Sequence, residues 1–434
     1  MNITRPTSRI RPIHWALCIM HCAFLTAMAA PSLSVDSVAQ RWPWNNKVDI
    51  TYTIADSGQD LANGVYRKLM FEVNIPGKAS PVVIDGSEDV VAPVKDGTYT
   101  VTWTPPADLA VKASGCTVTA KLYATDGDYM IIDLASGRYV FQDLADGATP
   151  AERQANSNAR YNTELYKGVT LSSGYRAGEI RMVLRRVAKG GTYPTGENYF
   201  AASQNKACTN ACTSWTTDRD YFIGVFMTTQ RQWKQFATSY QYPNDQPAWL
   251  SSWNTLRNSQ PPSVTLTKNA SGGSYLEWLN AKTGLLGFDL PTEVMWEIAA
   301  RAGRDGTPHW WGSAKPDATV AIMGKGNRVR VGTCAANDWG LYDISGNLWE
   351  LTRDGASLGD MTAAPDAFTP AAMPANDKVI ERGGPQYGIW GNSKPEDYWR
   401  ISYRAPSSNQ DHSAQISRTS TSRAFRIAWY YVGE

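Results

Sequence analysis

Between residues 33 and 144, the chain contains several runs in which apolar and polar residues alternate. The clearest runs are Lys47–Ile54, Thr98–Thr104, Cys116–Ala124 and Tyr129–Leu134. Asp-Gly turn signals separate several of them. A period of two places every second side chain on the same face of a strand. Residues 30–144 are therefore expected to form an all-β sandwich of immunoglobulin or fibronectin type, with no cluster of titratable groups.

The alternation ends near residue 144, and residues 145–177 are polar and poor in large apolar side chains. We expect a linker there. A strand is predicted at Glu179–Val187, and beyond it short strands, helices and aromatic loops alternate. Of the 17 Trp residues, 13 follow residue 200. The pattern of residues 178–434 is therefore neither all-β nor βαβ, and most of the tryptophans belong to this part of the chain.

Two helix starts can be placed from their capping residues. Thr229–Gln232 fits a capping box. Thr292 can cap a second helix, which shows an apolar face at i, i+4 spacing and ends near Gly303. Glu297 and Arg301 are one turn apart in that helix and are expected to pair on its surface, contributing roughly 0.2–0.5 kcal/mol.

Residues 1–29 have the pattern of a secretory signal peptide. Three Arg residues precede an apolar run at Trp15–Leu25, and Ala27-Met28-Ala29 supplies small residues for cleavage. The apolar run is too short to span a bilayer, and no later stretch has transmembrane character. We expect a protein that is secreted, periplasmic or on the cell surface, with an uncleaved anchor as the alternative.

Net charge limits the possible binding partners, and the cysteines limit the possible disulfide and metal chemistry. The chain has 42 basic and 40 acidic residues, and removing residues 1–29 takes away three Arg and no acid, leaving a net charge of −1. A near-neutral surface argues against nucleic acid as the main partner. Four cysteines follow the signal: Cys116, Cys208, Cys212 and Cys334. Cys208 and Cys212 could close a small disulfide loop, whereas metal capture is less supported because no second Cys or His pair lies nearby.

Five ordered motifs occupy the second half of the chain. They are FDLPTEVMWEIAARAG at 288–303, WWG at 310–312, NDWGLYDISGNLWELTRD at 337–354, VIERGG at 379–384 and SRAFRIAW at 422–429. Together they resemble the motifs of the formylglycine-generating enzyme family, the sulfatase-modifying factors, from about residue 180 to 430. The resemblance implies that residues 178–434 form a compact α+β domain related to C-type lectins, poor in regular structure and held together by buried aromatic residues.

The oxidases of that family bind copper(I) with two cysteines between the Arg-Gly-Gly and Gly-Phe-Arg motifs, and convert a substrate cysteine of sulfatases to formylglycine. This chain has no cysteine after Cys334, so copper and catalytic residues are not expected. The iron site of the related sulfoxide synthases needs three histidines, and only His309 and His412 follow the signal. The alternative of an oxidase that uses Cys334 with a remote thiol is kept as a second hypothesis.

The resemblance also implies a structural calcium site. Its ligands here would be the carboxylates of Asp343 and Glu350 and the backbone carbonyls of Gly346 and Leu348. The alternative is that Asp343 caps a turn and Glu350 pairs with Arg353 or another base.

RGGPQYGIWGNSKPEDYWRISYRAP, at residues 382–406, has the composition of a binding surface. In lectin-like folds this region commonly forms the ligand face. The residues expected to contact a glycan or protein ligand are Tyr387, Trp390, Asn392, Tyr398 and Trp399. For Trp399, core packing is an equal alternative. The leading hypothesis is therefore a ligand-binding module, and a structural role in a surface assembly is the third.

Overall fold

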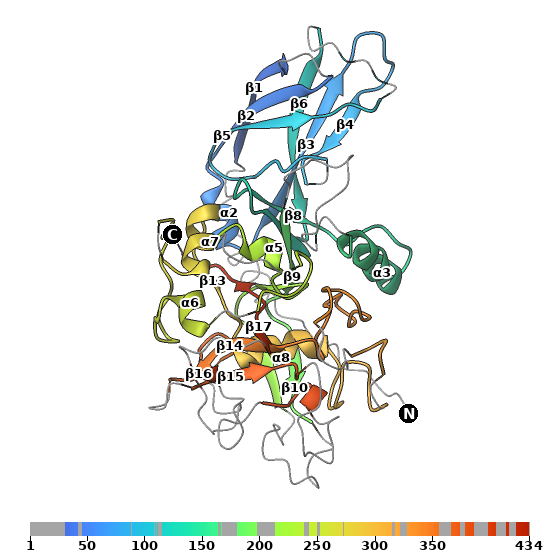
Figure 1. Ribbon diagram of the computed structural model, residues 1–434. Helices are drawn as coiled ribbons and strands as arrows, with labels where there is room; N and C mark the ends of the chain where they lie inside the picture. The colour runs from blue at the N-terminus through green and yellow to red at the C-terminus, as the bar shows by residue number, and fades with distance from the viewer. Residues whose placement is uncertain are drawn as a thin grey trace, which may run out of the picture.

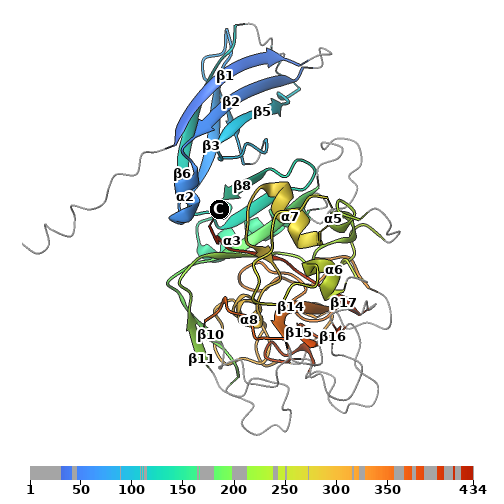
Figure 2. The ribbon, with the colours of Figure 1, turned by 90° about the vertical axis from the view of Figure 1, so that its left-hand side faces the viewer.

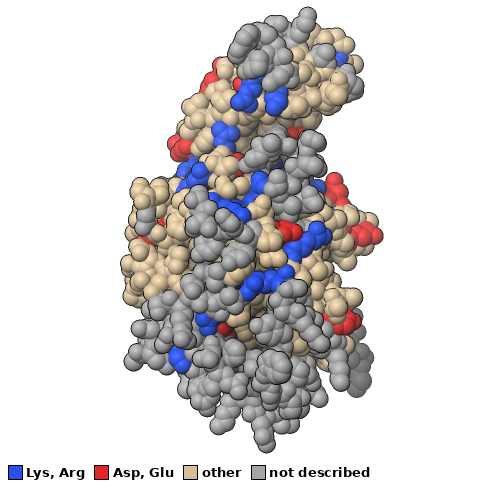
Figure 3. Space-filling model, viewed as in Figure 1, with Lys and Arg blue, Asp and Glu red and all other residues tan. Residues whose placement is uncertain are grey.

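The computed structural model describes most of the chain after residue 30. The described residues are 31–41, 46–87, 89–107, 109, 111, 115–163, 166, 180–197, 213–237, 243–249, 252–271, 273–314, 317–321, 328–355, 366–373, 378–385, 398–404, 414–415 and 422–433. They form an upper and a lower lobe (Figure 1), and basic and acidic side chains are present on the surface of both (Figure 3). No helix among them is long and apolar enough to cross a membrane.

The upper lobe consists of two three-stranded antiparallel sheets around one apolar core. One sheet has the order β1-β2-β5, with β1 at Ser32–Gln40, β2 at Val48–Ala55 and β5 at Gly97–Trp103. The other has the order β4-β3-β6, with β4 at Val82–Asp85, β3 at Tyr66–Asn74 and β6 at Thr117–Thr125. Ile50, Phe71 and Val101 lie in the shared core. Alternate residues of β2 are buried, as the period of two predicts.

The next two strands, β7 (Tyr129–Asp133) and β8 (Tyr139–Gln142), belong to the lower lobe. They complete a six-stranded sheet of order β13-β18-β12-β9-β7-β8. Its other strands are β9 (Arg181–Val187), β12 (Tyr221–Gly224), β13 (Phe288–Asp289) and β18 (Ala428–Trp429). All five residues of β7 are buried, because both faces of this strand are covered. The lower lobe thus begins before residue 144, where the sequence analysis placed the end of the first domain.

Part of the expected linker is also a helix, α3, at Pro150–Tyr161. Thr149 and Glu152 form a capping box at its start. Tyr161 is buried and donates its hydroxyl to Gln142 of β8 at 2.5 Å. The face that α3 buries includes Gln154 and Ser157. Composition did not reveal this helix because its buried face is largely polar.

The rest of the lower lobe surrounds a second sheet with short helices. The sheet has the order β16-β15-β14-β17, formed by β14 (Trp349–Gly355), β15 (Lys378–Arg382), β16 (Ala414–Gln415) and β17 (Arg423–Ala424). The helices are α5 (Gln230–Trp233), α6 (Trp253–Arg257), α7 (Tyr275–Thr283) and α8 (Glu293–Arg301), and β10 (Thr192–Thr195) pairs with β11 (Thr213–Thr216). The capping residues predicted at Thr229 and Thr292 are confirmed.

One tyrosine of the upper lobe is built into the lower one. The ring of Tyr66, at the start of β3, packs against Phe141 and Phe222 with centroid distances of 4.7 and 5.5 Å. Its hydroxyl donates to Asp220 Oδ2 at 2.7 Å. A short helix of the upper lobe, α2 (Gly58–Ala62), lies beside this junction in both ribbon views (Figures 1 and 2). Tyr66 therefore anchors strand β3 of the upper lobe in the hydrophobic core of the lower lobe.

Candidate functional site

The predicted binding stretch begins at the end of β15, where a buried ion-pair cluster holds the chain. Glu297 of α8 bonds Arg382 and also accepts the Arg301 Nε–H at 2.9 Å and the Gly196 amide at 2.7 Å. Glu297, Arg301 and Arg382 are all fully buried. The expected pairing of Glu297 with Arg301 across one helical turn is confirmed, but its expected place on the surface was wrong, because the pair is buried together with Arg382 from strand β15.

The electrostatics of this cluster favour the ionised carboxylate. Burial raises the pKa of Glu297, but the guanidinium groups of Arg301 and Arg382 outweigh it and hold the pKa below its usual value. Arg382 also donates to the Ile401 carbonyl at 2.9 Å. Arg382 thus connects α8 and β15 with Ile401, near the far end of the binding stretch.

Two of the five residues expected to touch a ligand, Tyr398 and Trp399, are buried. These two residues and the ion-pair cluster are together called the base of the binding stretch. Tyr398 and Trp399 are 7% and 6% exposed. The Trp399 indole donates to the Pro385 carbonyl at 2.9 Å. Tyr398 packs at 5.0 Å from the Tyr403 ring. These contacts favour core packing over ligand contact for both rings and hold the two ends of segment 385–399 together.

His309 contributes to the same base. Its Nδ1 lies 3.1 Å from the Trp399 carbonyl oxygen, which also accepts the Ser345 hydroxyl at 3.2 Å. The imidazole stacks on Trp311 with the rings 4.4 Å apart and nearly parallel. His309 is buried. Its spacing beside the two tryptophans could have suggested an aromatic stack.

Tyr387, Trp390 and Asn392 lie outside the described residues, as do Cys208, Cys212 and His412. The ligand contacts of the first three and the expected disulfide therefore stay predictions.

The proposed calcium loop is buried and carries a second ion pair. Glu350 accepts the Arg426 Nε–H at 2.6 Å, the Arg426 Nη2–H at 2.7 Å and the Trp296 indole N–H at 2.9 Å. Arg426 also donates to the carbonyls of Gly224 and Tyr342. The partner of Glu350 is thus Arg426, and sequence reasoning had named only Arg353 or another base.

Asp343 is the member of the loop that fits a cation. Its Oδ2 accepts the Gly332 amide at 2.7 Å, whereas its buried Oδ1 has no hydrogen-bond partner. Burial raises the pKa of Asp343 to about 6. A buried carboxylate oxygen without a donor is a position at which a bound cation would compensate the charge. On Glu350, Oε1 carries a single hydrogen bond from Arg426, so it retains capacity for a second ligand.

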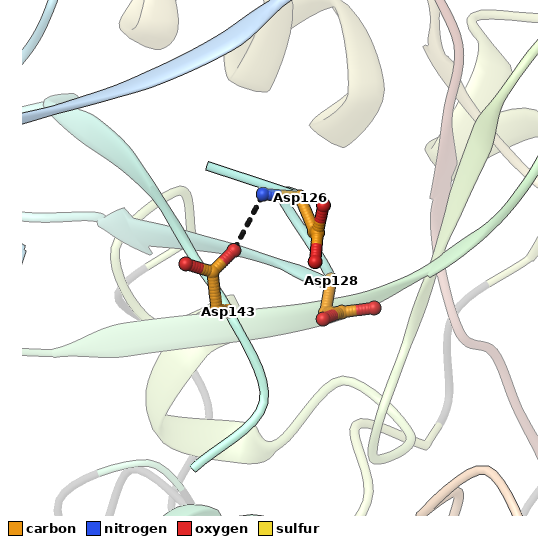
Figure 4. Close-up of side chains that lie close together, drawn as sticks. All are labelled: Asp126, Asp128 and Asp143. Atoms are coloured by element: carbon orange, nitrogen blue, oxygen red, sulfur yellow. Dashed lines mark hydrogen bonds between the residues drawn. The ribbon is translucent and has the colours of Figure 1, made fainter. Parts of the chain in front are cut away.

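A different carboxylate cluster lies between the ends of β6, β7 and β8. Ligand atoms of Asp126, Asp128 and Asp143 all lie within 4.8 Å of one another (Figure 4). However, Asp143 Oδ1 accepts the amide of Asp126 at 2.5 Å, and Asp128 pairs with Arg185 at 2.9 Å. These bonds explain the cluster as the closure of a turn, without a metal.

The two described cysteines are not placed for copper chemistry. Cys116 precedes β6 in the upper lobe, whereas Cys334 is buried in the lower lobe. Burial raises the pKa of the Cys334 thiol to about 12, with smaller contributions from Asp343 and Asp317. A thiolate is the form that binds copper(I), so this environment opposes metal binding at Cys334.

A family model describes the greater part of the lower lobe. Residues 181–428 match the sulfatase-modifying factor enzyme 1-like domain, which covers more than half of the chain. The chain belongs to this family.

Individual relatives match shorter stretches of the chain than the family model does. The chain is 36% identical over 101 residues to the inactive C-alpha-formylglycine-generating enzyme 2 of Bos taurus, covering 20% of this chain and 34% of that protein. It is 34% identical over 80 residues to the formylglycine-generating enzyme of Thermomonospora curvata, covering 15% and 26%. The chain thus spans about a third or less of the length of these relatives. Among solved structures, PvdO of Pseudomonas aeruginosa is similar with a TM-score of 0.44 at 20% identity, over 57% of this chain and 94% of PvdO.

Proposed function

We propose that the protein is a ligand-binding member of the family that lacks its oxidase chemistry. One observation carries this proposal: no cysteine follows Cys334. The region between the Arg-Gly-Gly motif and Arg423, where the family resemblance implies a copper(I)-binding thiolate pair, therefore has no sulfur ligand. Gly, Tyr, Trp and Asn in that region can hold a ligand but cannot bind copper(I) as thiolates do.

The proposed ligand surface is segment 385–399, with Tyr387, Trp390 and Asn392 as contacts and Tyr398 and Trp399 as its fixed base. Support comes from the contacts at both ends of the segment, where the Trp399 indole bonds Pro385 and His309 bonds Trp399. Anchoring the ends of a loop lowers the entropy lost when the loop binds. The ligand class is a glycan or an extracellular protein.

Binding to glycan and peptide arrays tests the proposal. Wild-type protein should bind a defined subset of the array, and Trp390→Ala should lower that binding by about tenfold or more, as expected for an aromatic anchor. Tyr123→Ala is the matched control, because Tyr123 is an exposed ring of the upper lobe, 42% accessible. An array without signal, or equal losses for both variants, would contradict the proposal and favour a structural role in a surface assembly.

Calcium is proposed as a structural ion at Asp343, with Glu350 and the carbonyls of Gly346 and Leu348 as the other ligands. The unpartnered Oδ1 of Asp343 supports it. Bound calcium would supply positive charge beside that carboxylate, and the loop residues would orient their oxygens toward it. Calcium should raise the melting temperature of wild-type protein but not of Asp343→Asn, in differential scanning fluorimetry with EDTA-treated samples. Equal responses would exclude Asp343 as a ligand.

Export is proposed from the pattern of residues 1–29. Intact-mass analysis of protein recovered outside the cytoplasm should show a chain that begins at residue 30. A full-length mass in that fraction would instead indicate an uncleaved anchor.

A further inference from the structure

Strand β5 lies at the edge of its sheet and faces the lower lobe. The sheet order is β1-β2-β5, and among the described strands β5 pairs with β2 alone. Figure 2 shows β5 as the strand of this sheet nearest to β8. An edge strand presents a row of backbone N–H and C=O groups on which another strand can pair.

A cavity of about 450 Å³ runs along this edge. Its upper-lobe wall includes Thr100, Val101, Thr102 and Thr104, and its lower-lobe wall includes Asp133, Ser136 and Arg138. The two lobes therefore build the cavity together. Its volume is within the range of roughly 300–1,000 Å³ that is typical of binding pockets.

Three cations line the cavity: Arg41, Lys47 and Arg138. None of them forms an ion pair with a described residue. Arg41 Nη1 donates to the Thr102 hydroxyl at 2.8 Å. The guanidinium of Arg138 lies 5.8 Å from the Tyr99 ring centroid. These contacts orient both arginines. The Asp49 carboxylate accepts the same Thr102 hydroxyl at 2.6 Å and so lies one hydroxyl away from Arg41, but it forms no direct ion pair with it. The three cations outnumber the single acidic residue of the cavity, and such a surface attracts an anionic partner.

The acidic residue of the cavity does not neutralise these cations. Asp133 Oδ1 accepts the Ala135 amide at 3.0 Å, and Asp133 Oδ2 accepts the Ser136 hydroxyl at 2.5 Å. Asp133 and Arg138 also pair through their backbones at 2.8 Å. The carboxylate thus closes the turn that presents Arg138.

That turn is fixed against the rest of the lobe. Gly137 has φ +77°, and a Cβ there would lie 1.9 Å from the Lys282 carbonyl oxygen of α7. Only glycine permits this close approach without a shift of the backbone. The wall of the cavity opposite β5 is therefore preorganised.

We propose that this cavity binds an extended, acidic polypeptide segment that pairs with β5 as a fourth strand. Its backbone bonds the free edge of β5, and its carboxylates face Arg41, Lys47 and Arg138. In this mode, main-chain hydrogen bonds supply affinity and alternate side chains supply selectivity. The positive charges favour an acidic strand over a neutral or basic one. The surface is separate from segment 385–399, so its ligand is a second partner.

Fluorescence anisotropy tests the proposal with a labelled peptide of about ten residues that alternates Glu and Thr, a length that covers one strand. The full chain should bind it, and the Lys47→Glu/Arg138→Glu variant should bind at least about tenfold more weakly. Lys78→Glu is the matched control, since Lys78 is exposed on the β3–β4 turn outside the cavity. Circular dichroism confirms that each variant is folded.

A second probe separates strand pairing from simple charge attraction. The same peptide with alternate backbone amides N-methylated keeps every carboxylate but cannot complete a strand ladder. It should bind about tenfold or more weakly than the parent. Equal binding of the two peptides would overturn the proposal in favour of a non-specific polyanion surface. Absence of binding, or equal losses with Lys78→Glu, would overturn it as well.

Discussion

The upper and lower lobes bury different chemistry. In the upper lobe the core residues are apolar, such as Ile50, Phe71 and Val101, and regular strands pair most of the backbone. In the lower lobe four arginines are fully buried: Arg257, Arg301, Arg382 and Arg426. Each bonds a carboxylate and at least one backbone carbonyl.

Arg257 illustrates the reason for this difference. It pairs with Asp289 and donates to the carbonyls of Gln260, Pro261 and Val264 at 2.7 to 2.8 Å. Carbonyls in irregular loops have no strand partner, and a buried carbonyl without a donor is costly. A guanidinium offers five N–H donors in a rigid fork, so one arginine can satisfy several loop carbonyls at once. In the lower lobe, buried arginines therefore donate hydrogen bonds to backbone carbonyls, a role that strand pairing has in the upper lobe.

Removing one of these arginines should have the largest effect on stability. Arg382→Met leaves Glu297 and the Ile401 carbonyl short of a donor, and we expect a loss of roughly 3–5 kcal/mol. Urea unfolding measures the loss, and hydrogen exchange should locate it in peptides from residues 349–429. Ile50→Ala is the comparison variant, and it should instead deprotect the upper lobe. If Arg382→Met increased hydrogen exchange equally in both lobes, the claim that buried arginines stabilise the lower lobe in particular would be contradicted.

Two carboxylates, Glu381 in the lower lobe and Asp96 in the upper lobe, should make stability respond oppositely to pH. Burial raises the pKa of Glu381 in β15 to about 7, although Arg423 opposes the change. The folded lobe then keeps its proton up to about pH 7, whereas the unfolded chain loses it near its usual pKa of about 4.3. Stability of the lower lobe should therefore fall as pH rises from about 4.3 to 7, by on the order of 3 kcal/mol.

The upper lobe has the reverse case in Asp96. Hydrogen bonds from the Ser57 hydroxyl and amide hold its pKa below the usual value. Its contribution to stability is present above the ordinary pKa and is lost as pH falls. Thermal unfolding of wild type and Glu381→Gln from about pH 2.5 to pH 8 separates the two effects, because the Asp96 contribution changes only below its ordinary pKa of about 3.9 and the Glu381 contribution changes above about 4.3. A pH profile that Glu381→Gln leaves unchanged would contradict the role of Glu381.

The junction between the lobes should respond more weakly. Tyr66→Phe keeps the ring contacts with Phe141 and Phe222 but removes the hydroxyl that bonds Asp220. We expect a loss of about 1 kcal/mol, the usual contribution of one hydrogen bond. Calorimetry should show the unfolding transitions of the two lobes moving apart. A single unchanged transition would mean that the apolar ring alone couples them.

The smallest effect is expected at the upper-lobe surface. Lys121 lies 2.8 Å from Glu72 across β3 and β6, but its side chain is 53% exposed. Solvent screens such a pair. Lys121→Met should leave the urea midpoint unchanged within error, in contrast with Arg382→Met. A clear loss of stability would show that surface pairs support this lobe too.

These contrasts explain what the sequence could predict. Alternation located β2 and β5, and Thr292 located the start of α8, because both signals depend on local chemistry. The run Tyr129–Leu134 was interpreted as an alternating strand of the first domain, but β7 is buried on both faces and pairs with β9 in the lower lobe, so local periodicity did not show which lobe it joins. Nor can local spacing tell a buried Glu297–Arg301 pair from a surface one, because the deciding partner, Arg382, is 85 residues from Glu297.

The candidate site shows the same limit. The sequence identified the loop of Asp343 and Glu350 and the aromatic stretch after Arg382 from their motifs. It did not reveal that Arg426 forms the ion pair with Glu350, or that Trp399 lies in the base of the binding stretch. Both facts depend on contacts between motifs that are distant in the sequence. Motifs therefore located the functional regions, whereas the role of each side chain came from packing.

Copper(I) titration of the reduced full-length protein, with oxygen uptake measured on a cysteine-containing peptide, tests the central claim most directly. Cys334 is the only thiol in the described part of the lower lobe, and burial raises its pKa to about 12. We therefore expect weak, non-stoichiometric copper binding and no peptide-dependent oxygen uptake. Tight binding of one copper(I) per chain together with oxygen-dependent conversion of the peptide cysteine would contradict it.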